Sequence, residues 1–105
     1  MSSHQDRLEV KVIEARHLSY EGTNPNSFAQ LDCGLDRRQT RLIAQEGNPE
    51  WRTKPFIFSS VLASDIQTLI LTLIHRDASS GRDIDLGWIQ VDLATFFNAP
   101  KVEIE

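Results

Sequence analysis

Leu8-Glu9-Val10-Lys11-Val12-Ile13-Glu14 alternates apolar and charged residues over its whole length. Successive side chains of a β-strand point to opposite faces of a sheet, so this period of two predicts a strand that is buried on one face. Leu8, Val10 and Val12 are expected to face the core. The chain is therefore expected to begin its fold with a half-buried strand.

Short strand patterns recur after this first one, separated by turn-forming residues. Further strands are predicted over residues 28–35, 38–43, 55–58, 69–74, 86–93 and 101–105, with short helical turns over 61–65 and 94–97. The continuous apolar run at 69–74 is the strongest of these signals. Seven or so short strands between turns predict an all-β, antiparallel β-sandwich.

Composition limits the chain to one domain of ordinary globular character. It has 105 residues, 40% of them hydrophobic and 25% charged, with a formal net charge of −4. A mildly acidic domain is a poor nucleic-acid binder, because phosphate contacts need an excess of cations. The apolar run at 69–74 is too short to span a bilayer. A lone cysteine, Cys33, favours the reducing cytoplasm, with association to the cytoskeleton or to a membrane left open.

The ends of the chain suggest how it is organised. Residues 1–6 are polar and are expected to form a flexible N-terminal segment, and residues 7–105 the sandwich. The alternating pattern at 101–105 stops inside a strand. We therefore expect a domain excised from a longer multidomain protein, with a naturally short chain as the alternative.

Three stretches, taken in order, point to one family. Residues 8–18 are similar to the opening strand of a C2 domain. Asn48-Pro49-Glu50-Trp51, followed by Phe56 and Phe58, resembles that family's Asn-Pro-x-Trp turn and its next strand. Residues 69–73, an Asp-bearing loop and Leu86-Gly87 resemble its last third. The resemblance implies a C2-like Greek key of about eight strands, in the circularly permuted variant whose last strand lies at the C-terminus.

The resemblance also implies where calcium ligands belong. The five expected aspartate positions fall near Tyr20, at Asn26 or Ser27, at His75, at Asp77 and at Asp83. Calcium needs about six to eight oxygen ligands, mostly carboxylate, and imidazole suits zinc or copper instead. We therefore expect no calcium binding and no other cofactor. The residual candidates for a cation site are Asp77, Asp83, Asp85 and Glu21, and their alternative role is to cap turns.

Two surfaces are candidate binding sites. If the strands at 38–43 and 55–58 pair, one basic face collects Arg37, Arg38, Arg41, Arg52 and Lys54. In the family such a face binds anionic lipid head groups or acidic protein segments, and each cation near an anionic membrane contributes about 1 kcal/mol. The second surface consists of the outward isoleucines Ile13, Ile70 and Ile74, which either form a protein interface or are covered by the loop from Asn98 or by the end of the last strand.

No catalytic motif appears: the sequence has no nucleophile elbow, P-loop, zinc-ligand spacing or dinucleotide fingerprint. Cys33 alternates with Leu31 and Leu35, which predicts a buried, inert thiol. We therefore expect no enzyme and no small-molecule substrate. The sequence favours a calcium-independent module that binds a protein partner within a larger cytoplasmic protein. The alternative is a peripheral membrane module that binds phospholipids through the basic face, and calcium-triggered docking is a third option.

Overall fold

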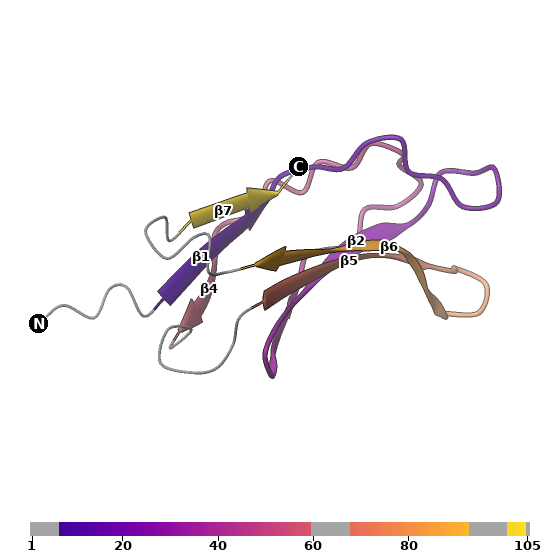
Figure 1. Ribbon diagram of the computed structural model, residues 1–105. Coiled ribbons are helices and arrows are strands. Elements are labelled where there is room, and N and C mark those ends of the chain that lie inside the picture. The colour runs from indigo at the N-terminus through magenta and orange to yellow at the C-terminus, as the bar shows by residue number, and fades with distance from the viewer. Residues whose placement is uncertain (1–6, 60–67, 93–100, 105) are drawn as a thin grey trace, which may run out of the picture.

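The computed structural model describes residues 7–59, 68–92 and 101–104. Within them the chain forms strands only, and Figure 1 shows them in two layers. In chain order the strands are β1 (Arg7–Val12), β2 (Ser27–Cys33), β3 (Asp36–Gln39), β4 (Phe56–Ser59), β5 (Thr68–Arg76), β6 (Asp83–Asp92) and β7 (Lys101–Ile104). No helix in this part of the chain is long and apolar enough to cross a membrane.

The strands form two sheets. The smaller sheet has the order β4-β1-β7 and the larger one β3-β2-β5-β6. Every pairing is antiparallel except that of β1 with β7, which is parallel, with Val10 opposite Val102. The all-β architecture with antiparallel sheets is confirmed, and the parallel pair is an addition to it.

Some expectations lie outside the described residues. These are the flexible segment at 1–6 and the helical turns at 61–65 and 94–97. The count of about eight strands and the circular permutation remain predictions, as does the division of a longer protein into domains. The described part of the chain contains seven strands.

The core lies between the sheets and follows the predicted alternation. Leu8, Val10 and Val12 of β1 are buried against residues of the larger sheet, including Leu31 and Leu71. Cys33 is also buried there, as expected. The remaining buried members of the cluster are Ala29, Trp51, Phe58 and Leu69.

The prediction that the second strand continues to Leu35 on the core face is wrong. The strand ends at Cys33, and Gly34 follows with a φ of 64°. This left-handed conformation suits glycine and turns the chain into β3. Leu35 consequently lies in the turn and is fully exposed.

The Asn-Pro-x-Trp segment forms a corner that ties the smaller sheet to the loops. The Ala15 N–H donates to the Pro49 carbonyl at 3.0 Å, and the Trp51 N–H to the Ile13 carbonyl at 2.8 Å. The Asn48 side-chain oxygen accepts from the His17 N–H at 2.9 Å. Trp51 itself is buried in the core. The corner therefore acts as scaffold, which is the role expected for a large apolar side chain at this position.

Candidate functional site

The loops at one end of the sandwich enclose a polar cavity of about 520 Å³. It lies where the segment between β1 and β2 meets the end of β5. The lining includes Tyr20, Asn26, His75 and Asp77. This is the end of the molecule to which the sequence assigned the residual cation-binding residues.

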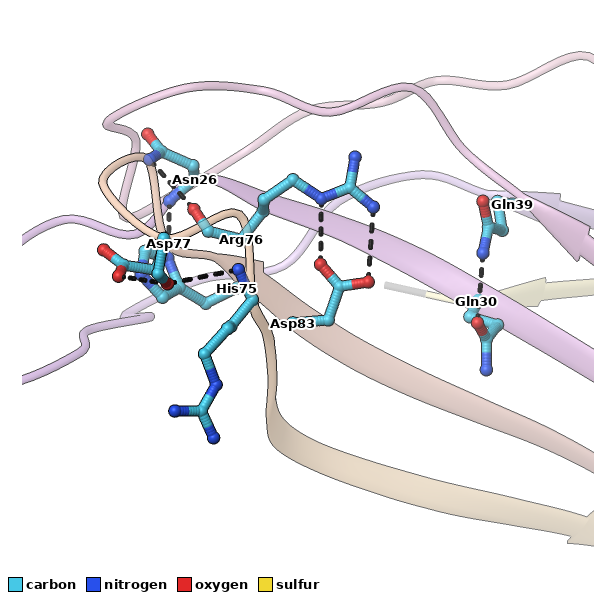
Figure 2. Close-up of polar contacts among 9 residues, drawn as sticks. Asn26, Gln30, Gln39, His75, Arg76, Asp77 and Asp83 are labelled. Carbon is cyan, nitrogen blue, oxygen red and sulfur yellow. Dashed lines mark hydrogen bonds and ion pairs between the residues drawn. The ribbon is translucent and has the colours of Figure 1, made fainter.

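His75 joins the two loops by hydrogen bonding and by stacking. Its Nδ1 accepts a hydrogen bond from the Asn26 backbone N–H at 3.0 Å, and its ring stacks on Tyr20 with the centroids 4.6 Å apart. The side chain is only 6% exposed. Figure 2 marks the hydrogen bond between Asn26 and His75.

Asp77 is held by the hydroxyls of its own loop. Ser80 Oγ donates to Asp77 Oδ2 at 2.7 Å, and Ser79 Oγ donates to the same oxygen at 3.0 Å. These two hydrogen bonds lower the pKa of Asp77, and the one from Ser80 has the larger effect. The carboxylate therefore caps the turn between β5 and β6, the role that the sequence offered as the alternative to cation binding.

Asp83, at the start of β6, forms a two-point ion pair with Arg76 at the end of β5. Arg76 Nε lies 2.8 Å from Oδ1, and Nη2 lies 3.2 Å from Oδ2 (Figure 2). The hydrogen bond from Arg76 lowers the pKa of Asp83. The Arg76 guanidinium also lies over the ring of Phe28, 5.1 Å from its centroid. Asp83 thus links the end of β5 to the start of β6 across the β5–β6 hairpin.

The residual carboxylates do not assemble into one donor set. Glu21 and Asp77 line the loop cavity, whereas Asp83 and Asp85 lie on β6. In the described part of the chain, no group of three or more His, Cys, Asp or Glu side chains is placed to hold a metal ion. Two carboxylates, one of them hydrogen-bonded to two serines, fit poorly with the coordination that calcium requires.

The strand pairing on which the expected basic face depends is not found. β3 pairs with β2, and β4 pairs with β1 in the other sheet. Arg37 forms an ion pair with Asp32 at 2.7 Å, and Arg52 with Glu50 at 3.1 Å. Arg41 and Lys54 are exposed, and neither has an ion-pair partner among the described residues.

Arg38 contributes to the architecture, because it connects the two sheets. Its Nη2 donates to the Ile57 carbonyl of β4 at 3.2 Å, and its guanidinium lies 5.3 Å from the centroid of Phe58. It also forms an ion pair with Asp36. A half-buried arginine with these contacts is poorly placed to reach a separate ligand.

Of the three isoleucines expected to form an interface, Ile74 is buried. It is only 5% exposed, and its register partner Phe28, over which Arg76 lies, is buried as well. Ile13 and Ile70 are half-buried. The two covers expected from the sequence, the loop from Asn98 and the end of the last strand, lie outside the described residues.

β6 carries an apolar surface that was not predicted from the sequence. Trp88 is 64% exposed and Ile89 is 47% exposed. Both border a groove of about 270 Å³ whose lining includes Val12, Trp51 and Leu73. The signal was present in the sequence: two large apolar residues in succession on one strand point to opposite faces, so a one-sided core covers only one of them.

Comparison with known proteins identifies the architecture. A model of the C2 domain family matches residues 6–104. No curated protein matches the chain. Among solved structures, it is similar to the paired C2 domains, A and B, of Extended-Synaptotagmin 2, with a TM-score of 0.76 and 22% identity over 90% of this chain and 32% of that one.

Two further structures share the fold. The calcium-bound form of the same two Extended-Synaptotagmin 2 domains matches with a TM-score of 0.75 and 20% identity, over 90% of this chain and 36% of that one. Human GIVD cytosolic phospholipase A2 matches with a TM-score of 0.66 and 21% identity, over 84% of this chain and 13% of that one. The chain thus spans about a third of the Extended-Synaptotagmin 2 chains, and at these identities the likeness concerns the fold.

Proposed function

Because this chain belongs to the C2 domain family, we propose that it is a non-catalytic, calcium-independent module that mediates protein–protein contacts within a larger cytoplasmic protein. The observation that carries this proposal is the state of the loop aspartates. Asp77 accepts hydrogen bonds from two serines, and Asp83 is paired with Arg76. A calcium ion would have to displace these partners and still find about six to eight oxygen ligands.

His75 supports the same proposal. It lies at one of the positions where the family resemblance implies an aspartate, and its Nδ1 already accepts the Asn26 N–H. A hard cation gains little from an imidazole that is buried and hydrogen-bonded. The loop end therefore resembles a closed structural cap more than an open coordination site.

Protein binding is favoured over membrane binding by the distribution of charge and apolar surface. Two of the five expected cations lie on β3 and the other three between strands, and three of the five have acidic partners. A single weak basic patch rarely anchors a protein to a membrane. The exposed apolar side chains instead lie on β6, and aromatic residues are enriched where proteins contact one another.

The test is co-sedimentation of the protein with phosphatidylserine-containing vesicles, with calcium and with a chelator, at low and physiological salt. We expect the protein to stay in the supernatant and calcium to change nothing. A calorimetric titration with calcium provides the second measurement and is expected to give no binding heat.

Two matched variants make the result decisive. Calcium-stimulated pelleting that disappears in Asp77→Asn would overturn calcium independence and restore the loop cation site. Calcium-independent pelleting that falls with salt and disappears in Arg41→Ala/Lys54→Ala would replace the proposal with the peripheral membrane module.

A further inference from the structure

β6 is a long strand at an open edge. It runs for ten residues, and in the order β3-β2-β5-β6 it is the terminal strand of the larger sheet. Within the described ranges β5 is its only pairing partner. An edge strand presents backbone N–H and C=O groups to which another strand can bond. A strand of this length offers a correspondingly long template.

The inner face of β6 is less covered than that of its neighbour. Ile89 lies opposite Leu71 in the ladder, so both side chains are on the core-facing side of the sheet. Leu71 is 4% exposed, whereas Ile89 is 47% exposed. The smaller sheet therefore covers β5 but leaves much of the inner face of β6 open. This difference in cover accounts for the groove between the sheets.

The groove has room for apolar side chains. Val12, Trp51, Leu71, Leu73 and Ile89 line it, and Gly87 contributes no side chain. A Cβ built at Gly87 would meet no atom within 4 Å. A segment lying along β6 can therefore place every second side chain into the groove.

Charge decides what kind of segment fits. β6 has three aspartates, Asp83, Asp85 and Asp92, and neither lysine nor arginine. Asp83 is already paired with Arg76, so the charge open to a ligand is centred on Asp85. Asp85 is exposed and has no ion-pair partner in the described part of the chain. A second copy of β6 would bring more carboxylates to the same edge, where like charges repel. A segment with lysine or arginine between its apolar residues complements this edge.

We propose that the β6 edge and its groove bind an extended apolar segment of a partner protein, carrying basic residues, which adds as a strand beside β6. The proposal rests on the protein-interaction function above and names the surface and the chemistry of the partner. Main-chain hydrogen bonds would supply affinity, and the groove and the aspartates would supply specificity.

The test is a titration of the isotope-labelled protein, followed by backbone amide NMR, with a synthetic peptide of alternating lysine and valine. Two control peptides have alternating glutamate and valine, or the lysine sequence with every second valine replaced by proline, which cannot complete a ladder. We expect saturable shifts along β6 with the lysine–valine peptide, and binding at least about tenfold weaker with either control.

Gly87→Phe is the decisive variant, because it places a ring in the groove from a position where an added Cβ meets no atom within 4 Å. We expect it to fold, as judged by its amide spectrum, and to bind the lysine–valine peptide at least about tenfold more weakly. Leu35→Ser, which truncates an exposed side chain in the β2–β3 turn, is the matched control and should bind as the wild type does.

Three outcomes would overturn the strand-addition proposal. They are undiminished binding by Gly87→Phe, shifts confined to acidic residues away from β6, and dimerisation through β6 without peptide, which would assign the edge to a second copy. The calcium and vesicle experiments test the loop cavity and the exposed cations. Gly87 does not line that cavity, so their results do not depend on these three outcomes. Failure of this inference and failure of the proposed function are therefore distinguishable.

Discussion

At the scale of single residues, His75 combines two contacts that can be separated by substitution. His75→Phe keeps an aromatic ring to stack on Tyr20 but removes the acceptor for the Asn26 N–H. A backbone donor left unsatisfied in a partly buried position costs about 1–3 kcal/mol. We expect urea unfolding to show a loss in that range.

The matched control for His75→Phe is His17→Asn. His17 is exposed and has a φ of 61°, a conformation that asparagine tolerates. Its stability should change by less than about 0.5 kcal/mol. Equal stability losses in the two variants would show that the hydrogen bond at Nδ1 contributes nothing.

Asp83 should make stability depend on pH in a predictable direction. Its pKa is lowered by the hydrogen bond from Arg76, so the folded protein holds the proton less readily than the unfolded chain does. The contribution is therefore complete above the unfolded pKa, about 3.9, and is lost as the pH falls through the folded value. We expect the urea midpoints of wild type and Asp83→Asn to differ most at neutral pH and to converge in acid.

Asp85→Asn removes a carboxylate without an ion-pair partner in the described region and so reports the effect of net charge alone. It should not reproduce the convergence seen with Asp83→Asn. If it did, the acid sensitivity would arise from general charge repulsion and not from the Arg76 pair.

At the scale of elements, Arg38 holds the edge of one sheet against the other. Its hydrogen bond to the Ile57 carbonyl and its contact with Phe58 link β3 to β4, which share no ladder. We expect Arg38→Ala to lower the free energy of unfolding by about 1–2 kcal/mol. Arg37→Ala, which breaks an exposed ion pair, should cost less than about 0.5 kcal/mol. Similar losses in chemical denaturation would contradict the bridging role.

Strand positions could be predicted from periodicity, but strand partners could not. The alternation in β1 gave its buried face correctly, because that pattern is local. The pairing of β3 with β4, which the basic face required as a condition, does not form, because the Asn48–Trp51 corner carries the chain to the other sheet. Ile74 is buried beside its register partner Phe28, and that pairing depends on long-range register, which periodicity does not contain.

At the scale of the whole molecule, the residues of the candidate site could be predicted in part, but their contacts depend on how the two sheets assemble. Asp77 and Asp83 were identified from their positions in the loops, but their partners depend on the turn geometry that forms between β5 and β6. The groove beside Ile89 depends on how far one sheet extends over the other, which is a property of the assembled layers. Tertiary arrangement, and not local pattern, decides which surfaces remain open.

Cys33 offers a measure of how the whole sandwich opens. The thiol is buried in the core, and burial raises its pKa, so little reactive thiolate is present in the folded state. Labelling by a disulfide reagent should therefore be slow in native buffer and fast in urea. If labelling requires global unfolding, its rate follows the population of unfolded protein. A core substitution should then raise the labelling rate by the same factor as the equilibrium constant of unfolding.

Phe58→Leu distinguishes global from local opening. Phe58 is buried in the same core but belongs to the other sheet, and its strand β4 shares no ladder with the β2–β3 hairpin that follows Cys33. We expect each loss of about 1.4 kcal/mol in stability to accelerate labelling about tenfold. If Phe58→Leu lowers stability and leaves the labelling rate unchanged, the thiol is reached by local opening of the β2–β3 hairpin. In that case the two sheets do not open as one cooperative unit.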